Sequence, residues 1–117
     1  MLHRRDPQRD LITYDGSRIS ELLGRVTTGD PALSVARIVM PPGAGQPLRR
    51  NNFRELLIVV EGGCTVELPQ GVVELQPDDV LELPPLTAYA ERGGPAGCVA
   101  WAICTPAFSR ELVEFLA

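Results

Sequence analysis

Short stretches of alternating apolar and polar residues, separated by proline and glycine, run along most of this chain. Alternation with a period of two is typical of strands that bury one face, because successive side chains point to opposite sides of a sheet. The predicted strands lie at residues 11–14, 33–40, 55–60, 64–68, 72–75, 80–83, 87–91 and 98–104. Turn signals recur roughly every eight to twelve residues, which predicts an antiparallel sandwich or barrel.

Several segments need a separate interpretation. Residues 17–27 fit either a short helical turn or a bent edge strand, and both stay open. The glycines at 62–63 and 93–97 predict turns between strands. Near the end, Ser109 followed by Glu111 predicts a short capped helix that runs to Leu116. Residues 1–10 are predicted as a solvated, flexible tail, and 11–117 as a single domain.

Composition excludes several classes of protein. With 44% hydrophobic and 22% charged residues, the chain is ordinary for a globular domain. No apolar run approaches the roughly 18 residues of a membrane span, so no membrane partner is expected. The charged start lacks the apolar core of a secretory signal, which favours a cytoplasmic location. A net charge of −4 argues against a nucleic-acid partner.

The reactive side chains narrow the chemistry further. All eleven cations are arginine, which excludes a lysine Schiff base, lysine-anchored pyridoxal phosphate and a P-loop. The single histidine, His3, lies in the predicted tail, so a Ser-His-Asp triad or a Cys-His pair is not expected. Cys64, Cys98 and Cys104 form no CxxC pair, and we interpret them as small buried side chains in a reducing compartment.

Residues 41–71 carry the most informative pattern, a polar cationic segment that leads into an apolar strand. This segment aligns with the motif G-x5-H-x-H-x3-4-E-x6-G. Gly43, Glu55 and Gly62 keep the residues of the motif, and Arg49 and Asn51 stand at its two histidine positions. Downstream, QPDDVLELPPLTAYAER is similar to G-x5-P-x-G-x2-H-x3-N, with Pro84 kept and Tyr89 in place of histidine. On these two motifs, the chain from about residue 16 to 108 resembles a small single-domain cupin.

The resemblance implies an all-β cupin barrel, a double-stranded β-helix or jelly roll, here with the short C-terminal helix. It also implies a homodimer, because cupins commonly pair through their outer sheets. A usual cupin binds a metal through three histidines and one glutamate, but this chain has Arg49, Asn51 and Tyr89 at the histidine positions. Arginine has no lone pair to offer a metal, so we expect neither a metal nor another cofactor.

Strand parity predicts which side chains face the interior. If Glu55 points inward, as the cupin glutamate does, residues two positions apart share its face. The predicted interior set is Arg49, Asn51, Phe53, Glu55, Leu57 and Val59, with Tyr89 facing them. A register with Leu48 and Arg50 inward stays open, although the spacer before Glu55 favours the first register. In that first register, Arg50 and Arg54 face outward.

The interior set supplies the candidate site residues. The candidate catalytic residues are Arg49 to hold a carboxylate, enolate or phosphate, Glu55 as general base, and Tyr89 to donate to an oxyanion. The candidate substrate-binding residues are Asn51, Phe53, Leu57, Arg37 and Trp101. Arg37 can face either side of its strand, and Trp101 fits the core or the cavity wall equally well.

These residues predict a metal-independent enzyme of the isomerase, cyclase or lyase type. Its substrate would be a small carboxylate- or carbonyl-containing metabolite, such as a polyketide-like intermediate. Two alternatives stay open. One is a non-catalytic small-molecule-binding or sensor cupin with Arg49 as its anion anchor. The other is a degenerate structural or partner subunit whose interior is filled by an Arg49–Glu55 ion pair.

Overall fold

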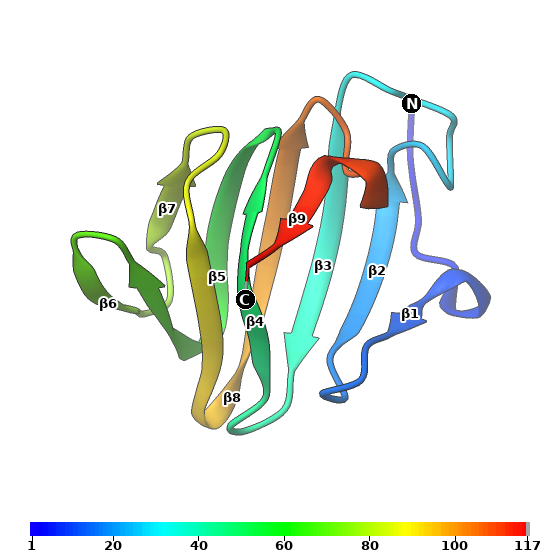
Figure 1. Cartoon of the computed structure of the whole chain (residues 1–117). Coiled ribbons are helices and arrows are strands. Elements are labelled where there is room, and N and C mark those ends of the chain that lie inside the picture. The colour runs from blue at the N-terminus through cyan, green and yellow to red at the C-terminus, as the bar shows by residue number, and fades with distance from the viewer. Residues whose placement is uncertain (117) are drawn as a thin grey trace.

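The computed structural model describes residues 1–116, and in these residues nine strands form one curled sheet (Figure 1). The strands are β1 (Leu11–Ile12), β2 (Arg18–Leu23), β3 (Ser34–Met40), β4 (Gly45–Asn51), β5 (Arg54–Leu68), β6 (Gly71–Leu75), β7 (Val80–Leu83), β8 (Tyr89–Thr105) and β9 (Val113–Phe115). Two 3-10 turns, η1 (Pro7–Arg9) and η2 (Arg110–Leu112), complete the elements. Residue 117, the last of the predicted domain, lies outside the described residues. Within the described chain, no helix has the length and apolar character needed to cross a membrane.

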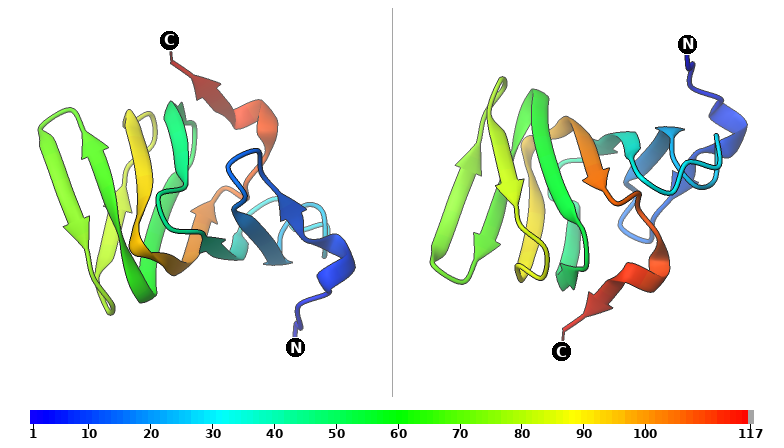
Figure 2. Two further views of the ribbon diagram at one scale, coloured as in Figure 1. Left: turned by 90° about the horizontal axis from the view of Figure 1, so that it is seen from below. Right: turned by 90° about the horizontal axis from the view of Figure 1, so that it is seen from above.

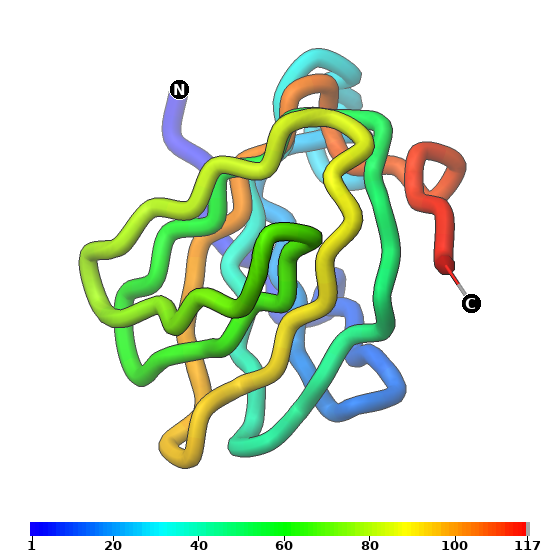
Figure 3. Tube along the Cα trace, turned by 60° about the vertical axis from the view of Figure 1, so that its left-hand side comes forward, coloured from blue at the N-terminus to red at the C-terminus, as the bar shows by residue number. Residues whose placement is uncertain are grey.

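The long antiparallel strands β5 and β8 are the centre of the sheet, paired from Arg54↔Thr105 to Glu67↔Ala90. The C-terminal half of β8 also pairs with β3, and its N-terminal part pairs with β4. The sheet is therefore strongly curved, and the chain trace curls round into a barrel (Figure 3). Seen from below and above, the N-terminal segment and the β6–β7 region lie at opposite ends of the molecule (Figure 2). The predicted all-β barrel is confirmed.

Side-chain size alternates along the second half of β8. The inward residues are small and buried: Cys98, Ala100, Ala102 and Cys104. Leu57 and Val59 of β5 lie beside Ala102 and Ala100 on the same face, so large and small side chains alternate across the two strands. The burial of all three cysteines, which are free thiols, agrees with their interpretation as small core residues.

Some segments fold as the sequence pattern predicts, and the structure assigns others that the pattern leaves open or does not predict. The hairpin of residues 64–75 is confirmed, with pairs from Cys64↔Leu75 to Leu68↔Gly71. The ambiguous residues 17–27 contain the strand β2. The strand β4 passes through the cationic segment, for which the alternation of the sequence predicts no strand.

The two glycine-rich turns predicted at residues 62–63 and 93–97 are wrong, because β5 and β8 run through them. Gly62 has a φ of +70°, and a Cβ there would lie 2.2 Å from the carbonyl oxygen of Gly97. The register of β5 against β8 shifts between Gly62 and Cys64. Glycine at this position permits a bulge and a close approach of two strands. A glycine in the sequence fits a bulge as well as a turn, so the sequence does not distinguish the two.

The predicted C-terminal helix is also wrong. Ser109 makes no side-chain capping bond, η2 is a single turn, and the chain then forms β9. Strand β9 pairs with β4 through Asn51↔Val113, and Arg50 forms an ion pair with Glu114 at 2.8 Å. Backbone hydrogen bonds along the edge of β4 outweigh the local helical signal.

Local interactions tie the first ten residues, the predicted flexible tail, to strand β2. Asp6 caps η1, and the Asp10 carboxylate forms ion pairs with Arg5 and Arg18. It also accepts a hydrogen bond of 2.7 Å from Ser20 of β2. The hydrogen bonds from Arg5 and Ser20 hold the pKa of Asp10 well below its usual range. The flexibility of this segment stays a prediction.

Candidate functional site

A cluster of polar side chains lies on the inner face of the barrel where β4, β5 and β8 meet. Arg49 and Asn51 come from β4, Glu55 from β5, and Tyr89 and Glu91 from β8. Asn51, Glu55 and Tyr89 are buried, with relative exposures of 6%, 8% and 2%, and the side chains of Arg49 and Glu91 are 13% and 8% exposed. We call these five residues the buried polar cluster.

Exposure decides between the two possible registers of the first motif. The Arg49 side chain is 13% exposed, whereas Leu48 is 40% exposed and the Arg50 side chain 44%. Arg54 also faces outward and forms an ion pair with Glu82 at 2.7 Å. Arg49 and Asn51 therefore face inward, and the register with Leu48 and Arg50 inward is excluded.

Arg49 makes contacts on several sides of its guanidinium group. Its Nη2 lies 2.8 Å from Oε1 of Glu91, its Nη1 donates to the Pro47 carbonyl at 3.2 Å, and its Cζ lies 4.4 Å from the centre of the Tyr89 ring. Burial opposes its charge, but the attraction of Glu91 and then of Tyr89 outweighs burial and raises the pKa of Arg49. In the described residues, Arg49 therefore pairs with Glu91 and not with Glu55, the partner in the alternative of a filled interior.

Sequence reasoning missed Glu91, although a signal for it was present. Glu91 follows Tyr89 by two residues on one strand, and strand parity places both on the same face. The parity argument applied to β5 therefore also finds Glu91 when it is applied to β8.

Glu55 lies where its proton can be gained or lost near neutral pH. Burial and repulsion by Glu91 raise its pKa to about 7, against the opposing attraction of Arg49 and hydrogen bonds from Cys104 and Tyr89. The Cys104 thiol lies 3.7 Å from Oε1 of Glu55. A buried carboxyl with such a pKa can serve as a general acid or a general base.

Tyr89 and Asn51 complete the cluster as hydrogen-bonding groups. Nδ2 of Asn51 donates to the Tyr89 hydroxyl at 2.9 Å, and no donor among residues 1–116 reaches Oδ1 of Asn51. Burial, and then repulsion by Glu55 and Glu91, raises the pKa of Tyr89 well above its usual value. The hydroxyl therefore stays protonated as a donor, and the Asn51 oxygen is a buried acceptor without a protein partner.

The other predicted substrate-binding residues are apolar core residues or lie on the outer face. Phe53 is 2% exposed and packs edge-to-face on Phe108, with 6.0 Å between ring centres, while Leu57 belongs to the hydrophobic core. Arg37 and Trp101 lie directly opposite each other on β3 and β8, on the face of the sheet that points away from the interior. Arg37 and Trp101 are therefore separated from the buried polar cluster by the sheet, whereas Leu57 shares the hydrophobic core with Tyr89.

A hollow of about 530 Å³ lies on the outer face of β4, β5 and β8, because its lining residues on β5 and β8 alternate with the buried Val66 and Tyr89. It is lined by Tyr14, Gly45, Gln46, Pro47, Leu48, Thr65, Glu67, Ala90, Glu91 and Arg92. Glu91 is the residue that the hollow and the buried polar cluster share. The other lining residues of β5 and β8 face outward, so the sheet lies between this hollow and the Arg49 guanidinium.

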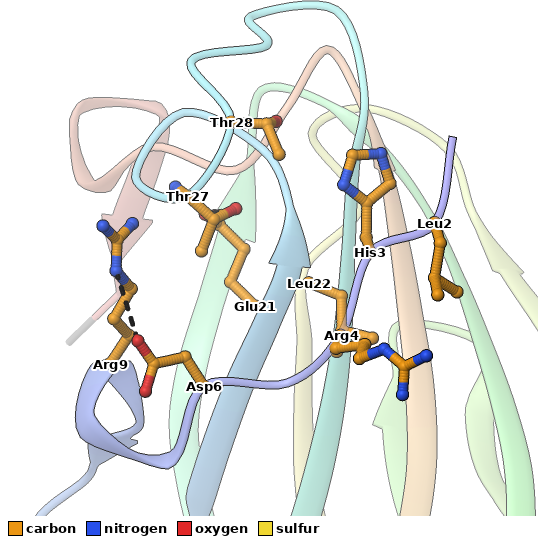
Figure 4. Close-up of a pocket in the computed structure, with 9 residues that line it drawn as sticks. All are labelled: Leu2, His3, Arg4, Asp6, Arg9, Glu21, Leu22, Thr27 and Thr28. Carbon is orange, nitrogen blue, oxygen red and sulfur yellow. Dashed lines mark hydrogen bonds and ion pairs between the residues drawn. The ribbon is translucent and has the colours of Figure 1, made fainter.

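A second hollow, of about 280 Å³, lies between the N-terminal segment and β2 (Figure 4). It contains His3, the single histidine, and Arg9, which lies 3.8 Å from Asp6. Glu21 at its wall accepts hydrogen bonds from the backbone of the following loop. Asp6, Arg9 and Glu21 are engaged by local partners, and the lining includes none of the buried polar cluster.

Comparison with solved structures identifies the architecture. Oxalate decarboxylase from Bacillus subtilis superposes with a TM-score of 0.80 at 14% identity, over 99% of this chain and 33% of that chain. A cupin-like protein from Thermotoga maritima gives 0.76 at 21% identity, over 100% and 89% of the two chains. This chain has the cupin fold. The same cupin fold occurs in Pac13, a nucleoside dehydratase, with a TM-score of 0.78 at 19% identity over 99% and 92%.

Sequence comparison adds less about this chain. No family model matches it. Endoribonuclease YbeY from Myxococcus xanthus is 35% identical over 101 residues, which make up 86% of this chain and 34% of that protein. The chain thus spans about a third of the length of that relative.

The buried polar cluster does not fit the metal site that the resemblance to usual cupins implies. The Arg49 guanidinium is a fixed cation without a lone pair, and it lies over Tyr89 among the remaining oxygen donors. Those donors include two carboxylates, and Glu91 is already paired with Arg49, which leaves Glu55 and a poor set for a hard cation. Across residues 1–116, no group of three or more His, Cys, Asp or Glu side chains is placed to hold a metal ion.

Proposed function

We propose that this cupin is a metal-independent acid–base enzyme of the isomerase, cyclase or lyase type, acting on a small carboxylate-bearing metabolite. The observation that carries the proposal is the buried carboxyl of Glu55, whose pKa of about 7 suits proton transfer at neutral pH. A protonated tyrosine and a fixed guanidinium lie beside it on the inner face of the barrel.

Each residue has a distinct role in the proposed reaction. Arg49 binds the carboxylate of the substrate through its guanidinium. Glu55 removes a proton from the carbon beside a carbonyl group, and the electron pair moves onto the carbonyl oxygen, where Tyr89 donates a hydrogen bond. Return of the proton to another carbon completes an isomerisation, whereas loss of a leaving group completes an elimination. Oδ1 of Asn51 accepts a hydrogen bond from the substrate.

The second candidate is a binding protein without catalysis, and the burial of the Glu55 side chain favours it. Glu55 is 8% exposed, and the hollow is lined by Glu91 but not by Glu55. In this reading the ligand engages Arg49 alone, and Glu55 serves only to balance charge.

A screen of small carboxylates by titration calorimetry tests the proposal. Arg49→Gln should abolish binding of any hit, while Arg50→Gln, an exposed neighbour on β4, should leave it unchanged. Glu55→Gln should keep the affinity but stop exchange of ligand carbon-bound hydrogen with deuterium oxide. Unchanged binding to the Arg49 variant would contradict the proposal, and binding without exchange in the unmodified protein would favour the second candidate.

A further inference from the structure

Two of the three free thiols lie beside each other in the interior of the barrel. Cys64 of β5 and Cys98 of β8 are each 3% exposed, and both belong to the hydrophobic core. The third thiol, Cys104, instead contacts Glu55 at 3.7 Å. Cys64 and Cys98 have no role in the proposed acid–base reaction, so an inference about them stands apart from the proposed function.

The pairing of the two central strands explains why these thiols meet. Cys98 pairs across the sheet with Gly62. Cys64 pairs in the same way with Gly93, so the direct partner of each cysteine is a glycine without a side chain. Between these two pairs the register shifts, because β8 has four residues there and β5 only one. The two cysteines are therefore diagonal neighbours on the inner face, with no side chain of a direct partner between their sulfur atoms.

The ionisation of the two thiols shows that they interact directly. A hydrogen bond between them is the largest influence on both groups, and it raises the pKa of Cys64 and lowers that of Cys98. Burial and repulsion by Glu91 oppose the ionisation of both. Cys98 is therefore the thiol that ionises first, and the thiolate is the form of cysteine that oxidants attack.

We propose that Cys64 and Cys98 form a modification site, at which hydrogen peroxide produces a disulfide within the chain. The Cys98 thiolate attacks one peroxide oxygen, the O–O bond breaks, and the hydroxide that leaves takes up the thiol proton as water. Cys98 is then a sulfenic acid. The Cys64 thiol attacks this sulfur, the S–O bond breaks, and hydroxide leaves with the Cys64 proton as a second water. The two thiols together lose two electrons, which reduce one peroxide to two water molecules.

The site is specific for this pair of cysteines. Cys104 lies on the same strand as Cys98, six residues further on, so their α-carbons are roughly 20 Å apart at about 3.3 Å per residue. This separation is too large for a disulfide. In a reducing compartment both thiols of the pair stay reduced, and the bond forms when the peroxide concentration rises. The cross-link then joins the two longest strands at their register shift.

Treatment of the folded, unmodified protein with hydrogen peroxide tests the site. After removal of peroxide, the protein is unfolded in urea, its free thiols are alkylated, and its mass is measured. We expect one alkyl group instead of the three that the untreated protein takes up, and a proteolytic peptide in which Cys64 is joined to Cys98. Dithiothreitol before alkylation should restore all three. In the matched control, Cys104→Ala, the treated protein should take up no alkyl group and give the same joined peptide.

Three alkyl groups after peroxide treatment would overturn the site, and so would a disulfide that includes Cys104 or joins two chains. Loss of thiols through added oxygen, without a joined peptide, would do the same. Cys64→Ala leaves Cys98 without its partner, so oxidation should stop at a sulfenic acid that dimedone traps. The absence of that adduct would overturn Cys98 as the reacting thiol. If this variant does not fold, the joined peptide of the unmodified protein decides alone.

Discussion

At the residue scale, the ionisation of Glu55 depends on neighbours from two strands, β4 and β8. Burial and the Glu91 carboxylate favour the protonated form, whereas Arg49 and the hydrogen bonds from Cys104 and Tyr89 favour the ionised form. The resulting pKa of about 7 lies above the usual value of 4.5, so the folded protein binds this proton more tightly than the unfolded chain.

The pH dependence of stability should reveal this proton. The contribution of Glu55 is fully present below about pH 4.5 and is lost as the pH rises through 7, with a total of about 3 kcal/mol. Glu55→Gln should remove this component, so the stability difference between variant and unmodified protein should change between pH 5 and 8.5 in urea unfolding. Glu82→Gln, an exposed control, should not change it. A constant difference for Glu55→Gln would contradict the assignment.

Arg49 and Arg50 are adjacent and both form ion pairs, but only Arg49 is mostly buried. Their substitutions should therefore differ in the stability that they cost. Arg49→Gln leaves the Glu91 carboxylate buried without a cation, which should cost about 3 kcal/mol of unfolding free energy. Arg50→Gln removes an exposed pair with Glu114, which should cost less than about 1 kcal/mol. Chemical denaturation at pH 8 compares them, and equal losses would show that Arg49 is solvated.

At the scale of elements, the close approach of β5 and β8 depends on Gly62. Gly62→Ala combines a positive φ with a Cβ placed 2.2 Å from the Gly97 carbonyl oxygen. Gly29 has a similar φ of +74°, with no atom within 4 Å of such a Cβ. We expect Gly29→Ala to cost about 1–2 kcal/mol and Gly62→Ala clearly more, measured by urea unfolding. Equal costs would mean that the two strands are not in close contact at this point.

The same elements show what the sequence could and could not predict. Alternation predicted the inward face of β5 and the hairpin of residues 64–75 because both depend on local order. The glycines inside β5 and β8 and the strand β9 depend on partners distant in the sequence, so local signals predicted turns and a helix there. Arg49, Asn51, Glu55 and Tyr89 were placed together correctly, whereas the partner of Arg49 required the observed geometry of β8.

At the scale of the whole molecule, the outer face of the barrel carries a partly exposed apolar surface. Two rows cross β3, β8 and β5 on this face: Arg37–Trp101–Ile58 and Val35–Ile103–Leu56. Apolar side chains that remain half-exposed on adjacent strands suit a protein interface. A homodimer through this face stays a prediction, as do the cytoplasmic location and the absence of a nucleic-acid partner.

Light scattering after size exclusion tests the homodimer. We expect a mass of about twice the 12.7 kDa of the chain, and Ile58→Glu should reduce it to the monomer mass because a charge cannot be buried unpaired in the interface. Val72→Glu, at an exposed position on β6, should leave the dimer intact. A monomeric unmodified protein would exclude this interface.

The most direct test of the proposed acid–base function is a 13C NMR titration of the Glu55 carboxyl group in the unmodified protein. A midpoint near 7 is predicted, since Glu55 is buried beside Glu91 and Arg49. A midpoint near 4.5 would contradict the account, because Glu55 would then be solvated like a surface carboxylate and unsuited to proton transfer at neutral pH.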